Sequence, residues 1–243
     1  HDLVGRAQMR MGEHSRARKA FSRALRSGAK DSRTATHYLL ATYAGADAGV
    51  ASRLAQLTAA RDPTNLAARA IRALSSENEM AEFVRQTKAF VGEYEFEMLE
   101  IALVFAELGL TKEAVTLLDA ACVQGVPQSE RSPLPLYYLA YYASRHGDEE
   151  QAKQYLRQAA GIWRDYVFPS RPEAVDVLQY AIKNSPRDGH AHLHLGNLLG
   201  GLGRVEQAVL HWEKAAEANP KLSIAWRNLG LAAAARENDL KKA

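Results

Sequence analysis

A spacing of about 34 residues between recurring alanines constrains this chain more than any other feature of its sequence. Ala51 follows Ala17 at this distance, and Ala208 follows Ala174 at the same distance. A large apolar residue, Trp212, stands four positions after Ala208. Residues four apart share one face of a helix, so such pairs mark helix-packing surfaces. A unit repeated at this period predicts an array of helical hairpins that share one continuous core.

Glycines at a fixed offset support this interpretation. Four of them stand five residues before the alanine of their own unit: Gly12, Gly109, Gly147 and Gly203. Glycine enters the left-handed backbone region without steric cost and commonly ends a helix there. We therefore expect each of these glycines to close the tight turn between the two helices of a hairpin.

The repeat predicts an all-α fold, a single α-solenoid of about six hairpins over residues 1–243. Its expected parts are two regular repeats over 1–65, a degenerate hairpin over 66–94, two looser repeats over 95–165, and an irregular bridge with C-terminal repeats over 166–243, the last one truncated. Two departures from the period stand out. Residues 126–133 read as a long loop, and residues 162–169 read as an irregular connection.

The best-preserved unit begins near Gly189. It reads His192-x2-Leu195-Gly196-x2-Leu199, followed by Ala208-x3-Trp212, Ala215 and Pro220. This unit resembles the tetratricopeptide repeat, with histidine in place of the opening tryptophan and leucine in place of the tyrosine. The resemblance implies a scaffold that binds proteins on a concave wall, which the first helix of each repeat forms.

A second resemblance covers the last third of the chain. It rests on three runs of residues: 166–171, 195–199 and 226–230. They are similar to the C-terminal repeat region of a family of large, uncharacterised bacterial proteins with a β-rich, carbohydrate-related N-terminal domain. This resemblance implies that an N-terminal portion outside the given sequence carries the activity. It leaves open an alternative function, an accessory helical module of a carbohydrate-active enzyme.

Charge and hydropathy narrow the classes of partner. Residues 1–35 hold nine basic and three acidic residues, whereas residues 77–120 hold ten acidic and three basic ones. Because the basic character does not continue along the array, we expect no nucleic-acid partner. No apolar run reaches the length that a membrane-spanning helix needs, so we expect no membrane partner. Cys122 is the single cysteine, which gives secretion no support and fits a cytoplasmic protein.

Two clusters could carry chemistry. His190 and His194 share a helix face and could chelate a divalent metal. Glu93, Glu97 and Glu100 also share a face, and paired carboxylates perform acid–base catalysis when their pKa values differ. Neither cluster has the partners that complete a familiar site, so packed histidines and a solvated glutamate face are the expected alternatives. We expect no enzyme activity, no cofactor and no metal.

The candidate binding residues lie on the predicted first helices. Amphipathic aromatic residues with arginine and asparagine are typical of recognition surfaces. Seven positions form this set: Tyr43, Tyr137, Tyr141, Arg145, Asn197, Arg227 and Asn228. By resemblance, Asn197 and Asn228 match the asparagines of carboxylate-clamp repeats, although Leu193 stands where a clamp lysine is expected. The alternative, equally open, is that the tyrosines pack against the Phe168 region and Arg227 pairs locally.

Overall fold

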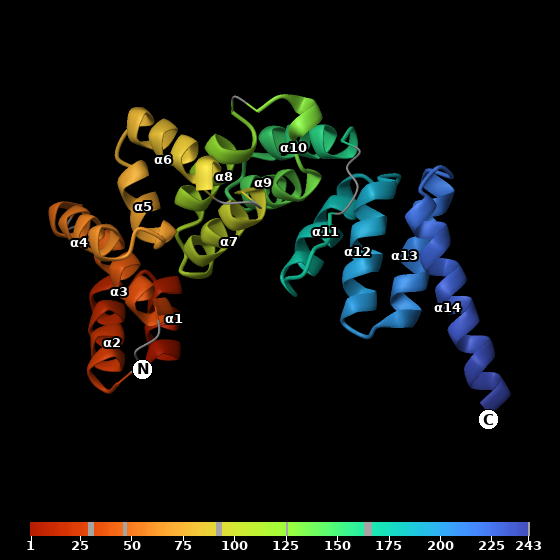
Figure 1. Cartoon of the computed structure of the whole chain (residues 1–243), viewed down its shortest axis with the longest axis horizontal. Helices are drawn as coiled ribbons and strands as arrows, with labels where there is room; N and C mark the ends of the chain where they lie inside the picture. The colour runs from red at the N-terminus through yellow and green to blue at the C-terminus, as the bar shows by residue number, and fades with distance from the viewer. Residues whose placement is uncertain (29–31, 46–47, 91–93, 125, 163–166, 243) are drawn as a thin grey trace. The chain divides into compact units, whose positions relative to one another are not determined.

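The computed structural model describes residues 1–28, 32–45, 48–90, 94–124, 126–162 and 167–242 (Figure 1). Within these ranges the chain forms fourteen α-helices, one short 3-10 helix and no strand, which confirms the all-α class. The chain divides into two compact units, residues 1–126 and 127–243. The single continuous solenoid over 1–243 stays a prediction.

The first unit is built from helices α1 to α8. Their bounds are α1 (Asp2–Arg10), α2 (His14–Arg26), α3 (Ser32–Ala44), α4 (Ala48–Arg61), α5 (Leu66–Ala73), α6 (Glu77–Phe90), α7 (Tyr94–Glu107) and α8 (Thr111–Cys122). Consecutive helices pack as hairpins, α1 on α2 and α7 on α8 among them. The segment over 66–94, although degenerate in sequence, also forms a helical pair, α5 on α6.

The second unit contains the short 3-10 helix η1 and helices α9 to α14. Their bounds are η1 (Gln128–Glu130), α9 (Pro133–Arg145), α10 (Glu149–Ala160), α11 (Ala174–Asn184), α12 (Gly189–Gly201), α13 (Val205–Ala218) and α14 (Ser223–Lys242). Helices α9 and α10 form one hairpin, and α12 and α13 form another. Between them α11 packs against both α9 and α12, so a single helix stands where a full repeat would supply two. In the sequence, the recurring alanines Ala152 and Ala174 are only 22 residues apart, which is too short for a complete extra repeat.

The turns within the hairpins confirm the role of the glycines. Gly12, Gly109, Gly147 and Gly203 have φ angles of 74°, 83°, 82° and 76°. All four lie in the left-handed region, where a side chain would be strained. Each therefore ends the first helix of its hairpin and lets the chain reverse at once into the second.

Small residues and aromatic rings form the seam inside the hairpins. Ala17, Phe21, Ala208 and Trp212 are buried, as the repeat predicts. A Cβ on Gly196 would lie 2.6 Å from the Trp212 ring, closer than any real contact. The glycine is thus required by the ring, because only a bare backbone lets the two helices approach this closely.

Candidate partner-binding residues

Tyr137 is part of the core, which corrects the expectation that it lies on an open face. Its side chain is 0% exposed, and its hydroxyl donates to Oδ2 of Asp188 at 2.8 Å. Burial, followed by the nearby Asp188 carboxylate, raises the pKa of Tyr137 well above its usual value. The other carboxylate oxygen of Asp188 accepts from the backbone N–H groups of His190 and Ala191. Asp188 therefore caps α12 and ties it to α9. Tyr137 is packed, and its printed contacts are with Asp188 and His194.

Tyr141 and Arg145 form an accessible cluster with Tyr180, which we call the Tyr–Arg patch. The Arg145 guanidinium lies 5.5 Å from the Tyr141 ring centroid, and its Nη1 donates to the Tyr141 hydroxyl at 2.9 Å. Tyr180 of α11 meets Tyr141 edge to face, with ring centroids 5.9 Å apart. Arg145 is exposed and both tyrosines are half-buried. The patch is an ordered, amphipathic surface that spans α9 and α11.

Asn197, Arg227 and Asn228 form a second cluster, between α12 and α14. The Oδ1 atom of Asn197 accepts from the Asn228 side-chain amide at 2.8 Å and from the Trp212 indole N–H at 3.0 Å. Arg227 donates to Oδ1 of Asn228 at 3.2 and 3.3 Å. The two asparagines bind each other, and Arg227 has the local partner that the packing alternative expects. Arg227 is nevertheless exposed and keeps further donors for a ligand.

Tyr43 belongs to the first unit. It lies on α3 and is half-buried. Burial, with a smaller contribution from Glu113 of α8, raises the pKa of its phenol. The seven candidates therefore fall into four groups, since Tyr137 and Tyr43 each stand apart from the two clusters, and the binding role of the set stays a prediction.

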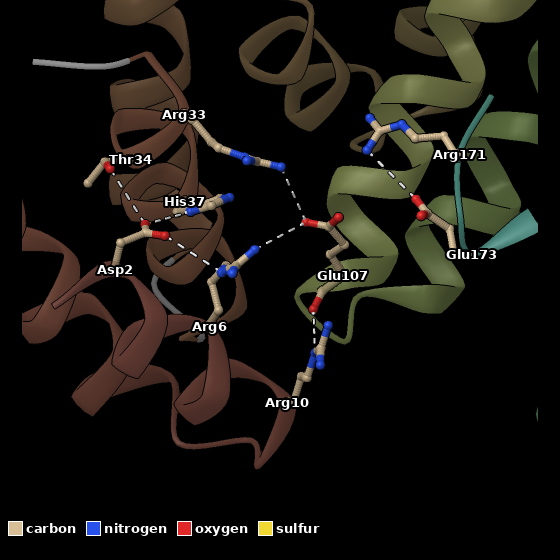
Figure 2. Close-up of polar contacts among 9 residues, drawn as sticks. All are labelled: Asp2, Arg6, Arg10, Arg33, Thr34, His37, Glu107, Arg171 and Glu173. Atoms are coloured by element: carbon tan, nitrogen blue, oxygen red, sulfur yellow. Dashed lines mark hydrogen bonds and ion pairs between the residues drawn. The ribbon is translucent and has the colours of Figure 1, made fainter. Parts of the chain in front are cut away.

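A polar cluster joins the beginning of the first unit to the end of α7 (Figure 2). Arg6 and Arg33 approach Oε2 of Glu107 at 3.8 and 3.9 Å, and Nε of Arg10 donates to the Glu107 backbone carbonyl at 3.0 Å. Asp2 meets Nδ1 of the buried His37 at 2.8 Å. Arg6 and Arg33 place positive charge beside the Glu107 carboxylate at the C-terminus of α7. Arg10 donates to a backbone carbonyl there that has no partner within the helix. Their placement fits an internal contact.

Figure 2 also draws an ion pair of the second unit, which is separate from this cluster. Arg171 and Glu173 approach to 3.7 Å in the segment that precedes α11. Both side chains are half-buried. The pair lies in the non-helical stretch that leads into α11, just after the irregular connection that the sequence predicts over 162–169. Residues 163–166 of that connection lie outside the described residues.

The histidines of α12 are packed. His194 is buried, and that burial lowers its pKa to about 4. His192 and His211 meet through their Nδ1 atoms at 2.9 Å, and burial lowers the pKa of both. Nε2 of His192 lies 3.2 Å from the Pro186 carbonyl, so it carries the proton while Nδ1 accepts from His211. In the described ranges, no group of three or more acidic, histidine or cysteine side chains is arranged to hold a metal ion.

The carboxylate cluster is described only in part, and the single cysteine is buried. Glu93 lies outside the described residues, while Glu97 and Glu100 are half-buried on α7. Cys122 is buried, and burial raises the pKa of its thiol far above the usual value, so it is not a nucleophile at neutral pH. No helix in the described part of the chain is long and apolar enough to cross a membrane.

Sequence reasoning missed two residues of this region, Asp188 and Tyr180. The first had a usable signal, because aspartate directly before a predicted helix start is a typical N-cap. The second had none, because the packing of α11 against α9 is not visible in the repeat pattern.

A tetratricopeptide repeat family model matches residues 195–243, which cover most of α12 and all of α13 and α14. A search of curated proteins found no match. The resemblance to large bacterial proteins with a β-rich domain stays a prediction.

Similar solved structures include those of MamA, Cut9-Hcn1 and YrrB. MamA is 17% identical over 81% of this chain and 82% of its own, with a TM-score of 0.29. The APC/C hetero-tetramer Cut9-Hcn1 is 15% identical over 96% of this chain and 48% of that one, with a TM-score of 0.35. YrrB, described as a TPR protein with an unusual peptide-binding site, is 15% identical over 90% and 84%, with a TM-score of 0.28. TM-scores below 0.5 carry no argument about shape or function. The family model shows tetratricopeptide repeat over residues 195–243, and the glycine-closed hairpins of the described residues are consistent with that class of repeat.

Proposed function

We propose that the chain is a non-catalytic scaffold that binds a protein or peptide segment, or another domain of its parent chain, through the Tyr–Arg patch. The repeat fold supports this class of function, because stacked hairpins display ordered side chains over an extended surface. The alternative of an accessory module for a carbohydrate-active enzyme gains no support from the geometry or the comparisons.

The arrangement of Arg145 carries the proposal. Its guanidinium is held over the Tyr141 ring and by the Tyr141 hydroxyl, so much of its conformational freedom is already lost. One N–H bonds the hydroxyl, and four remain in the fixed fork that matches a carboxylate. Beside it, the Tyr141 and Tyr180 rings offer apolar area with few rotamers to freeze. The preferred ligand is therefore a segment with an acidic side chain next to an apolar one.

The test is a binding selection followed by matched substitutions. A display library of unstructured peptides is selected on the intact chain, and the affinity of the selected peptides is measured for each variant. Tyr141→Ala and Arg145→Ala should each weaken binding by about tenfold to thirtyfold, as truncation of interface hot spots does. Arg145→Lys should recover only part of the loss, because lysine lacks the planar fork.

Arg157→Ala is the matched control, since Arg157 is exposed on α10 of the same unit. It should leave the affinity unchanged. The melting temperature is measured in parallel, because the rings of the Tyr–Arg patch also contact each other. If Tyr141→Ala lowered the melting temperature strongly and left the affinity intact, the patch would be a packing feature and the proposal would fail.

A further inference from the structure

Arginine side chains from two helices of the first unit converge on Glu107, the last residue of α7. Figure 2 shows Arg6 extending from α1 and Arg33 from α3 toward its carboxylate, and both approach the same oxygen, Oε2, at 3.8 and 3.9 Å. A third arginine, Arg10, donates to the Glu107 backbone carbonyl instead. One carboxylate therefore draws α1 and α3 toward the end of α7.

The contacts of this carboxylate differ from other ion pairs of the same unit. Glu13 accepts from Arg16 at 2.8 Å, which is a true hydrogen bond. Glu82 accepts from Arg85 at 2.7 Å in the same way. Both approaches to Oε2 of Glu107 are too long for a hydrogen bond. Glu107 thus attracts its arginines by charge alone.

Three polar atoms around this contact are buried and have no hydrogen-bond partner among the described residues. They are Nε of Arg6, Oε2 of Glu107 and Nε2 of His37. The carboxylate of Asp2 lies 3.6 Å from Nε of Arg6, which is also too far for a hydrogen bond. Each of the three atoms loses its hydrogen bonds to water in the closed contact and gains no replacement. The contact is therefore weakly held and easily displaced.

The charges of the cluster favour an acidic ligand. Arg6, Arg10 and Arg33 carry three positive charges, against two negative charges on Asp2 and Glu107. The Asp2 carboxylate is already engaged by His37, at 2.8 Å. A ligand with several adjacent carboxylates can offer each arginine a bidentate partner, which a single shared oxygen cannot do.

We propose that Arg6 and Arg33 bind an acidic peptide segment, and that Glu107 occupies their site as an internal competitor until the segment displaces it. Two acidic side chains of the ligand bond the two guanidinium groups, and the released Glu107 carboxylate regains its hydration. This site belongs to the first unit, whereas the Tyr–Arg patch belongs to the second. Its ligand needs no apolar residue, so the inference does not depend on the proposed function.

The probe is a fluorescently labelled peptide of four consecutive glutamates flanked by glycines, and its binding to the intact chain is followed by anisotropy in low salt. Glu107→Gln keeps the shape of the side chain and removes the competing charge. It should strengthen binding about threefold to tenfold, since each of the two ion pairs that it removes is worth up to about fivefold. Arg33→Gln, which changes an exposed residue, should weaken binding about fivefold or more.

Glu13→Gln is the matched control, because it removes the same charge from the same unit and releases Arg16 from a well-formed hydrogen bond. It should leave the affinity unchanged. An equal gain in this variant would overturn the proposal, because binding would then follow the net charge. Unchanged affinity in Glu107→Gln would also overturn it, because Glu107 would then not compete for the site.

Hydrogen exchange of the complex, resolved by helix, shows where the acidic peptide binds. Exchange should change in α1, in α3 and at the end of α7, and it should stay the same in α9 and α11. Changes confined to α9 and α11 would place the acidic peptide on the Tyr–Arg patch. That result would overturn the present proposal and leave the proposed function intact.

Discussion

The first hairpin, α1–α2, and the hairpin α12–α13 have the same seam but are held in place differently. In both, a glycine on the first helix accommodates an aromatic ring from the second. Phe21 is fully buried and packs against His37, with ring centroids 5.4 Å apart. Trp212 is 8% exposed and needs Asn197 to accept its N–H.

The polar contacts that join each hairpin to neighbouring helices differ more. Helix α1 is held by charged contacts to Glu107, which lies far away in the sequence at the end of α7. Helix α12 is held by a buried hydrogen-bond network, in which Asp188 caps the helix and accepts from Tyr137. The repeat pattern thus specifies the seam, while each hairpin is positioned by polar contacts that the pattern does not contain.

Truncation of the two rings should have the largest effect. Phe21→Ala and Trp212→Ala should each cost about 3–5 kcal/mol, because both remove a buried aromatic ring and leave a cavity. Hydrogen exchange, resolved by helix, should show the loss in α1 and α2 for the first variant and in α12 and α13 for the second. A loss below about 1 kcal/mol in either would show that the shared seam is not what holds that hairpin together.

Acid should weaken the α12–α13 hairpin. Burial lowers the pKa of His194 to about 4, from an ordinary value of 6.5 in the unfolded chain. As the pH falls, the unfolded state binds the proton first, so stability is complete above pH 6.5 and is lost progressively toward pH 4. At pH 5.5 the loss should be about 1.4 kcal/mol from this residue alone.

Exchange protection of α12, measured between pH 7 and pH 5 and corrected for intrinsic rates, follows this loss. Replacing His194 with phenylalanine should reduce the pH dependence to the part that His192 and His211 contribute, whereas replacing the exposed His146 with glutamine should leave it unchanged. An unchanged slope in the first variant would contradict the assignment.

The charged anchor of α1 should have the smallest effect. Glu107→Gln should cost about 0.5–1 kcal/mol, because its carboxylate pairs with partly exposed arginines at long distances. The difference from the wild type should shrink in about 0.5 M salt, since screening weakens such pairs. Urea denaturation at low and high salt measures both effects. Met9→Gln, which alters the buried seam instead, should show no comparable salt dependence.

Much of the fold could be predicted from the sequence because it depends on local geometry. The four turn glycines and the buried alanines follow from backbone preference and the repeat period. The helical pair α5–α6 follows from the apolar faces of its two segments. The candidate site was predicted less well. Helical spacing predicts that Tyr137, Tyr141 and Arg145 lie on one stripe, and all three do lie on the single helix α9. The spacing cannot show which other helices pack against that stripe.

The sequence by itself determined the units of this protein: where helices start and stop, which turns need glycine, and which positions form the seam of each hairpin. The tertiary structure decided what lies beyond each seam. Tyr137 is buried and bonds Asp188, which lies 51 residues away in the sequence, whereas Tyr141, one turn away, remains accessible beside Arg145. Helical periodicity acts within one element, but burial depends on neighbours that residues far away in the chain supply.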